Sequence, residues 1–143
     1  MSDLLPPLVR SYAGDPSSLR AVRRDVAELL ARRGASAEFH ERVALVVTEL
    51  AANAVQAAPG RPYVVEASIH DDVVIVRVRN HTTGAGPPPR AAWTTPDHAA
   101  PRGRGLPIVA SLADEAVVHR PDHETVEVTA RLRFVRATTE PTV

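Results

Sequence analysis

The sequence predicts an α+β fold, a two-layer α/β sandwich with helices on one face of a mixed, mainly antiparallel sheet. Three observations predict it. Apolar residues recur at helical spacing in the first half, they alternate with a period of two in the second half, and the two patterns do not interleave as in parallel folds. The length suits one domain, so we expect a single domain over 1–143, with a core from about 8 to 135 and a flexible tail at 137–143.

The chain begins with a predicted strand and a predicted helix. Residues 8–12 have strand composition, and Asp15 followed by Pro16 is typical of a helix start, because proline at the first helical position loses no hydrogen bond. Leucines and valines then recur at helical spacing until Gly34, a residue type that commonly ends helices. Arginines cover the other side of this helix, where we expect them to be solvated.

A second helix is predicted from Ser36, a favourable capping residue, to about Ala57, before Pro59 and Gly60. Its middle part is apolar on nearly all sides. A helix of that kind is normally buried, so we expect this one to lie in the centre of the molecule.

The second half predicts strands that pair as hairpins. Asp71-Asp72 is the predicted turn of the first hairpin, and Pro121-Asp122 that of the second. A stretch rich in proline and glycine separates the hairpins, and its length is typical of a functional lid or of disorder. The predicted segments are strands at 63–70 and 73–79, a loop at 80–101, a helix at 105–112, and strands at 115–120 and 125–135.

Composition excludes several classes of function. The 17 basic residues, all arginine, balance 17 acidic residues, so no net positive field attracts nucleic acid or an anionic membrane. The chain has no cysteine, which removes disulfides and thiolate metal sites and fits a reducing compartment. The N-terminus lacks a secretory pattern, and no apolar run reaches the roughly 18 residues that a membrane helix needs. We therefore expect a cytoplasmic protein whose partners are proteins.

Two polar residues, Glu49 and Asn53, interrupt the apolar second helix. Their spacing of four places them on the same side, one turn apart. A carboxylate and an amide oxygen there suit a hard cation such as Mg²⁺, and the carboxylate also suits proton transfer. An equally simple interpretation is a polar pair that ties the helix to a neighbouring loop.

Two glycine-containing segments are further candidates. Arg102, Gly103, Arg104 and Gly105 precede a predicted helix, where backbone N–H groups, a helix N-terminus and two guanidinium groups together favour phosphate. The same residue types are also ordinary in exposed loops. A second segment, from Asn80 through Gly84 to Gly86, leaves the end of a strand. It suits closure over a ligand, or a plain flexible exit from the sheet.

Taken in order, residues 46–55 (VVTELAANAV) and 103–109 (GRGLPIV) resemble two sequence boxes of one family. That family is the histidine-kinase-like ATPase superfamily of gyrase, heat-shock-90, histidine-kinase and mismatch-repair proteins. Within it, the chain looks most like the stand-alone anti-sigma factors of the serine-kinase type. The resemblance covers roughly residues 8–135.

The resemblance implies a nucleotide site between a helix and a lid loop, with ATP and Mg²⁺ as cofactors. Asn53 matches the Mg²⁺ ligand, and Glu49 matches the general base that activates a hydroxyl or water. Gly103 and Gly105, with their neighbouring arginines Arg102 and Arg104, match the phosphate-contacting turn. Thr125 matches a threonine near the adenine. Asn80 stands at the position of the adenine-binding acidic residue, and the glycines of the lid region come later, at Gly84 and Gly86.

The resemblance also implies a function. Such proteins hold a sigma factor away from RNA polymerase, and an anti-anti-sigma partner with a STAS fold releases it. Many of them phosphorylate a serine of that partner with ATP. The resemblance also suggests a homodimer. We expect no direct binding of nucleic acid or membrane.

This sequence departs from the family pattern at the adenine side. Asn80 stands where the family usually has an aspartate, Thr82 where it has a glycine, and acidic Glu124 near a usual Gly-Lys pair. An uncharged acceptor at Asn80 makes a weaker hydrogen bond than a carboxylate. The alternative function is therefore an adaptor of the same fold that binds proteins but binds ATP weakly or not at all.

Overall fold

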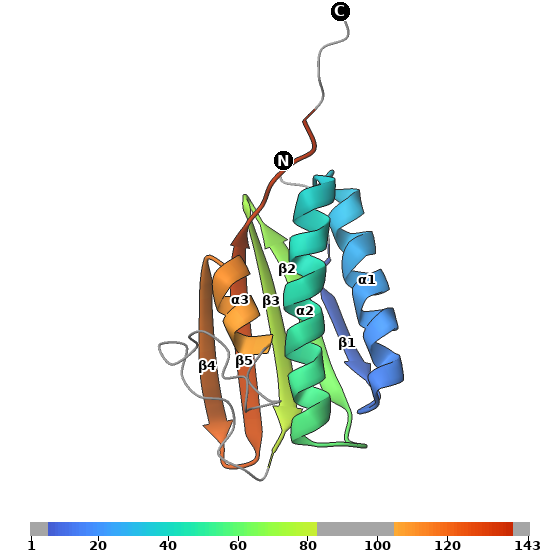
Figure 1. The fold of residues 1–143 in the computed structure, drawn as a ribbon, viewed down its shortest axis with the longest axis vertical. Coiled ribbons are helices and arrows are strands. Elements are labelled where there is room, and N and C mark those ends of the chain that lie inside the picture. Colours follow the sequence, from blue (N-terminus) through green and yellow to red (C-terminus); the bar gives the residue numbers. More distant parts are fainter. Residues whose placement is uncertain (1–5, 83–104, 139–143) are drawn as a thin grey trace, which may run out of the picture.

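The computed structural model describes residues 6–82 and 105–138 of the chain, and Figure 1 shows their arrangement. Two of the helices are long and the third is short. In order, the elements are β1 (Leu8–Tyr12), a 3₁₀ turn (Pro16–Ser18), α1 (Leu19–Arg32), α2 (Ala37–Ala57), β2 (Tyr63–His70), β3 (Val73–His81), α3 (Gly105–Leu112), β4 (Glu115–Asp122) and β5 (Thr125–Arg133).

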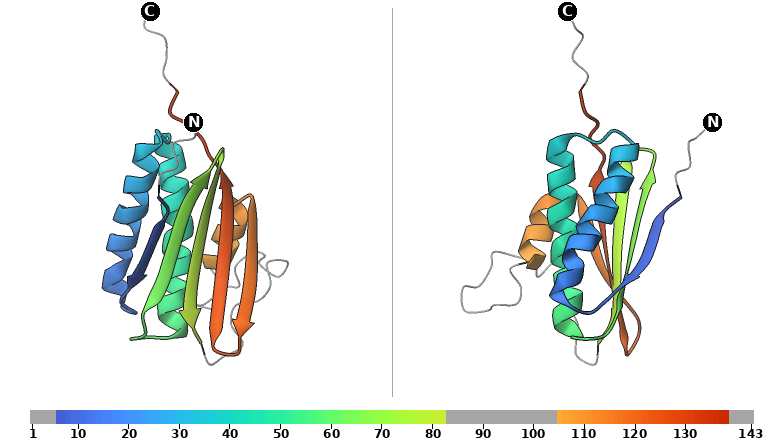
Figure 2. Two further views of the ribbon diagram at one scale, coloured as in Figure 1. Left: turned by 180° about the vertical axis from the view of Figure 1, so that it is seen from behind. Right: turned by 90° about the vertical axis from the view of Figure 1, so that its right-hand side faces the viewer.

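The strands form one five-stranded sheet in the order β1-β2-β3-β5-β4. All three helices cover the same face of this sheet, and the other face carries no helix in the described part of the chain (Figure 2). The predicted α+β sandwich is confirmed. The expectation of a mixed sheet was wrong in one respect, since every strand pair among the described residues is antiparallel. The chain runs from β1 to β2 through α1 and α2, and it reverses direction at each connection. The neighbouring strands β1 and β2 therefore run in opposite directions.

Side-chain caps begin the 3₁₀ turn before α1 and the helix α2, and glycines follow the ends of both long helices. The Asp15 carboxylate accepts a hydrogen bond from the Ser17 N–H at 2.8 Å, and the Ser36 hydroxyl accepts one from the Phe39 N–H at 3.1 Å. Gly34, with φ of 74°, and Gly60, with φ of 81°, follow the two helices in the left-handed region that favours glycine. The predicted start of the second helix and both predicted ends are therefore confirmed. The first helix differs, because Asp15 and Pro16 begin the 3₁₀ turn and α1 starts after it, at Leu19.

Three strand ends differ from the predicted ones. β3 continues to His81, two residues beyond the predicted end, because it pairs with β5 along its whole length. β4 continues to Asp122, so the hairpin turn lies at residues 123–124 and not at Pro121-Asp122. β5 ends at Arg133, two residues early, and the chain then leaves the sheet.

The segment after β5 returns to the connection between α1 and α2. The Ser36 N–H donates to the Val135 carbonyl at 2.9 Å, and the Ala137 N–H donates to the Gly34 carbonyl at 2.9 Å. The Phe134 ring packs edge-on against Phe39, with 5.3 Å between ring centroids. Ala137, predicted to begin a flexible tail, is therefore still hydrogen-bonded.

The core lies between α2 and the inner face of the sheet. Val43, Val46 and Val47 of α2 are fully buried there. The inner face presents a regular alternation of small and branched apolar side chains, from Val65, Ala67, Val74, Val76, Val78, Val126, Val128, Ala130 and Leu132. The core is thus built mainly from valine, leucine and alanine, as the low aromatic content predicts.

One charged group, Asp25 of α1, is buried in this apolar layer with a side chain only 7% exposed. The Tyr12 hydroxyl donates to its carboxylate at 2.7 Å, and Arg10 forms an ion pair with it at 2.8 Å. Burial opposes ionisation, but the Tyr12 hydrogen bond and the Arg10 charge outweigh it and lower the pKa of Asp25. Burial and the Asp25 contact raise the pKa of Tyr12. The network attaches β1, at the edge of the sheet, to α1.

Replacing Asp25 by Asn is expected to destabilise the fold by about 2 kcal/mol at pH 7, because Arg10 loses its partner and Tyr12 loses a charged acceptor. Urea unfolding measures this difference. The pKa of Asp25 in the folded chain lies below its ordinary value of 3.8, so the unfolded chain binds more protons near that pH. The network therefore stabilises fully above pH 3.8 and loses its contribution as the pH falls through the lower, folded pKa.

The difference in stability between the wild type and Asp25→Asn should accordingly shrink below about pH 4. Asp72→Asn, at an exposed aspartate with no ion pair in the described structure, is the matched control and should change stability little at any pH. A difference between wild type and Asp25→Asn that stays constant from pH 7 to pH 3 would contradict the assignment.

Candidate functional site

Glu49 and Asn53 form the half-buried border of α2, next to its fully buried stripe. They lie one turn apart along the helix and about 40° apart around its axis. α1 and α3 flank α2 on opposite sides, and α2 packs against both (Figure 1). In Figure 1, the N-terminus of α2 is at the top and the buried stripe of α2 faces the sheet. The right-handed turn of the helix then places the Glu49–Asn53 border on the side of α2 that faces α3.

Neither polar group of this border is satisfied within the described structure. Glu49 has no hydrogen bond or ion pair among the described residues. The Nδ2 atom of Asn53 is fully buried and has no hydrogen-bond partner there. Leaving a buried amide N–H unpaired costs about 1–3 kcal/mol, so the fold gains nothing from an asparagine here. No described residue ties the pair to a neighbouring loop, and residues 83–104 lie outside the described part of the chain.

Nδ2 is the buried end of the Asn53 amide, so the amide oxygen is the end that can face an outside ligand. With the carbonyl oxygen turned outward, Asn53 offers the kind of ligand that Mg²⁺ prefers, and the Glu49 carboxylate lies one turn away. The residues present therefore fit a Mg²⁺-nucleotide. No cluster of three or more acidic or histidine residues competes as a metal site in the described part of the chain.

The end of β3 approaches the same end of the molecule as the C-terminal half of α2 and the beginning of α3 (Figure 1). Asn80 is buried, and its Nδ2 donates to the His81 carbonyl at 2.9 Å. Its carbonyl oxygen accepts no hydrogen bond from a described residue and remains available to an outside donor. Thr82 is also buried, and its N–H donates to the Glu124 carbonyl in the β4–β5 turn at 2.8 Å. The strand end that carries Asn80 is thus held in place.

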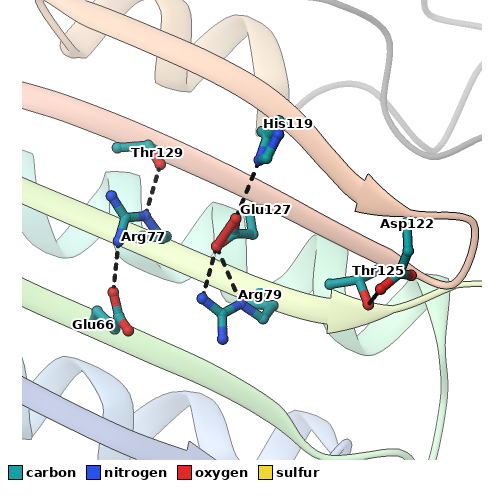
Figure 3. Close-up of polar contacts among 8 residues, drawn as sticks. All are labelled: Glu66, Arg77, Arg79, His119, Asp122, Thr125, Glu127 and Thr129. Atoms are coloured by element: carbon teal, nitrogen blue, oxygen red, sulfur yellow. Dashed lines mark hydrogen bonds and ion pairs between the residues drawn. The ribbon is translucent and has the colours of Figure 1, made fainter.

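Thr125 is not brought together with Asn80. β3 and β5 pair Asn80 with Val126, whose side chain is buried on the inner face, so the preceding Thr125 belongs to the open face. Its hydroxyl donates to the Asp122 carboxylate at 3.3 Å (Figure 3). Hydrogen bonds from the Glu124 N–H and from Thr125 lower the pKa of Asp122. The placement of Thr125 beside the adenine, which the resemblance implied, has no support in this geometry.

The remaining predicted residues have limited structural support. Gly105 is the first residue of α3, as the sequence predicted. The other glycines and arginines of the two candidate segments, Gly84, Gly86, Arg102, Gly103 and Arg104, lie outside the described residues, and their roles remain predictions.

A network of ion pairs covers the open face of the sheet (Figure 3). Arg77 bonds the Glu66 carboxylate at 2.8 Å and the Thr129 hydroxyl at 3.2 Å. On the neighbouring row, Glu127 accepts from Arg79 at 2.8 Å. Burial opposes ionisation of Glu127, but the Arg79 hydrogen bond outweighs it and lowers its pKa. This network lies on the opposite side of the sheet from the Glu49–Asn53 border.

Sequence reasoning missed both this network and Asp25. Alternation alone placed these charged residues on a strand face, but the pairs depend on which strands are neighbours. No helix in the described part of the chain combines the length and the apolar character needed to cross a membrane.

Comparison with known proteins identifies the family. The chain matches the model of the histidine kinase-like ATPase domain over residues 12–132. None of the curated proteins matches it significantly. Among solved structures, it is similar to the RsbU and RsbW domains of Rv1364c from Mycobacterium tuberculosis, with 22% identity and a TM-score of 0.68 over 94% of this chain and 35% of that one. It is also similar to full-length ShkA in complex with AMPPNP, with 19% identity and a TM-score of 0.60 over 87% of this chain and 31% of that one.

The chain spans about a third of the length of these two solved proteins. At such identities the structural likeness establishes the fold alone, whereas the family model covers most of the sequence. The chain therefore belongs to the histidine kinase-like ATPase domain family.

Proposed function

We propose that this protein is a cytoplasmic anti-sigma factor that sequesters an RNA polymerase sigma factor and is released by a STAS-domain anti-anti-sigma partner. The observation that carries its nucleotide site is the unsatisfied pair on α2, the buried Asn53 amide beside the unpaired Glu49 carboxylate. Support for the partners comes from the likeness to a structure that contains an RsbW domain, and from a balanced charge that does not favour nucleic acid.

Several residues at this end of the molecule would together bind Mg²⁺-ATP. Asn53 would hold the metal through its amide oxygen, and the side-chain carbonyl of Asn80 would accept a hydrogen bond from the adenine amino group. The beginning of α3 at Gly105 faces the phosphates, where backbone N–H groups favour negative charge. When bound, ATP supplies the phosphoryl group. Glu49 would accept the proton of the serine hydroxyl as the serine oxygen attacks the γ-phosphoryl group, and ADP would leave.

A second function, that of an adaptor that binds proteins without turning over ATP, is favoured by one observation. Asn80 offers a neutral oxygen where a carboxylate would make a charge-assisted bond roughly twice as strong. The Asn80 amide nitrogen donates to the His81 carbonyl, which fixes the direction of the amide oxygen. That oxygen carries no full negative charge. Affinity for ATP decides between the two functions.

Mg²⁺-ATP should bind the wild-type protein weakly, in a calorimetric titration of the purified chain. Asn53→Ala should abolish binding, because the metal loses its amide ligand. Asn80→Asp should improve affinity by about two- to five-fold, because a charged acceptor outweighs the lost bond to His81. Tight wild-type binding that Asn80→Asp leaves unchanged would contradict this account of the adenine contact.

Asn53→Ala should also stabilise the nucleotide-free protein, by about 1 kcal/mol or about 3 °C in Tm, because it removes an unpaired buried amide and improves helix propensity. Gln56→Ala, at an exposed position of the same helix, introduces alanine without removing a buried amide and should stabilise by less. If Asn53→Ala lowers Tm instead, the amide has a structural partner and the functional assignment of Asn53 is wrong.

The partner proposal predicts a stable complex with one sigma factor of the same organism, seen as co-elution in size-exclusion chromatography of purified proteins. A cognate STAS-domain protein should release the sigma factor, and labelled phosphate should move from ATP to that protein. Glu49→Gln should reduce this transfer at least ten-fold while leaving the sigma complex intact. Complex formation without any transfer would favour the adaptor, and failure to bind any sigma factor would exclude the anti-sigma function.

A further inference from the structure

Asp114 joins the short helix α3 to the sheet through two hydrogen bonds in opposite directions. Its N–H donates to the Arg131 carbonyl at 2.9 Å, and its carboxylate accepts from the Arg133 N–H at 2.6 Å. Asp114 lies between the last residue of α3 and the first residue of β4. We propose that Asp114 is a positioning residue that sets the phosphate-facing start of α3, a role that rests on the nucleotide site proposed above.

The register of the sheet explains why a carboxylate is needed at this point. β4 and β5 pair Glu115 with Arg131, so continuation of the ladder would place residue 113 opposite Arg133. Ala113 instead extends the helical path, because its N–H donates to the Val109 carbonyl at 2.8 Å and its side chain is buried. The ladder therefore lacks a backbone acceptor for the Arg133 N–H. The Asp114 carboxylate takes its place, with the short distance typical of a charged acceptor.

The helix that Asp114 holds has little stability of its own. α3 has eight residues, and isolated helices shorter than about 12 residues are marginal in water. Its position therefore depends on packing against α2 and β4 and on the attachment at its C-terminal end.

The two ends of α3 move together, because eight residues of helix form a stiff rod about 12 Å long. A change at the Asp114 attachment consequently displaces Gly105 at the other end. The adenine acceptor Asn80 belongs to β3, which pairs with β2 and β5 and does not depend on α3. Asp114 should therefore affect binding of phosphates and not binding of the base.

This separation gives a test that a general loss of stability does not mimic. Binding of Mg²⁺-ATP and of adenosine is measured by NMR titration of the ¹⁵N-labelled full chain, which detects millimolar affinities. Asp114→Ala should weaken Mg²⁺-ATP at least five-fold and change adenosine affinity less than two-fold. Asp114→Asn keeps an oxygen acceptor and should retain most of the affinity for Mg²⁺-ATP. Glu115→Ala, at an adjacent exposed carboxylate that makes no side-chain bond within the described structure, should match the wild type.

Hydrogen exchange on the nucleotide-free protein tests the attachment independently. In Asp114→Ala, amides of residues 109–113 should exchange at least ten-fold faster, while those in the centre of α2 stay unchanged. Equal losses for ATP and adenosine, or no loss for either, would overturn the positioning role. If the wild type binds neither ligand, the proposed nucleotide site fails, and unchanged exchange in α3 would then overturn the attachment as well.

Discussion

The packing of the α2 stripe against the inner face of the sheet is the interaction on which the rest of the molecule depends. Val43, Val46, Val47 and Leu50 are almost fully buried against alternating apolar side chains of β2, β3 and β5. Full burial of each such side chain contributes about 1.5–3 kcal/mol. Because this stripe fixes the rotation of α2 about its axis, it also fixes where Glu49 and Asn53 project. The candidate site is thus a consequence of core packing, with no further element needed to aim its two polar groups.

Charged side chains have different partners on the two faces of the sheet. On the open face, carboxylates and guanidinium groups pair across strands, and no helix of the described chain covers them. On the helical face, the buried carboxylate of Asp25 is matched by Tyr12 and Arg10. Against this background, two buried polar atoms of α2 have no hydrogen-bond partner among the described residues, Asn53 Nδ2 and Thr48 Oγ1. Buried polar groups in native proteins are normally hydrogen-bonded, so the unpaired atom that borders the candidate site, Asn53 Nδ2, is an exception consistent with a functional role.

Local patterns allowed much of the fold to be predicted from the sequence. Strand 8–12 and helix 105–112 have the predicted bounds, because alternation, capping residues and helix-ending residues act over a few neighbours. Strand neighbours could not be predicted in the same way, since pairing of β3 with β5 depends on the whole chain. The buried Asp25 network was missed for this reason. It joins residues from β1 and α1 that no short-range pattern connects.

The residues of the candidate site also differ in how well the sequence predicted their placement. The spacing of Glu49 and Asn53 is a helical property, and the structure places both on one border of α2. Thr125 was matched by resemblance alone. The apolar alternation at residues 126, 128, 130 and 132 already indicated that Thr125 belongs to the opposite face of the strand. This alternation is visible in the sequence, and it argues against a contact between Thr125 and the adenine side.

The central claim is that the Asn53 amide is part of a Mg²⁺-nucleotide site. The most direct measurement is the NMR signal of the Asn53 side-chain amide, assigned by its absence in Asn53→Ala, during addition of ATP with and without Mg²⁺. The account predicts a saturable shift of this signal that requires Mg²⁺. A signal that stays unchanged while other residues respond to ATP, or a response that ignores Mg²⁺, would contradict it.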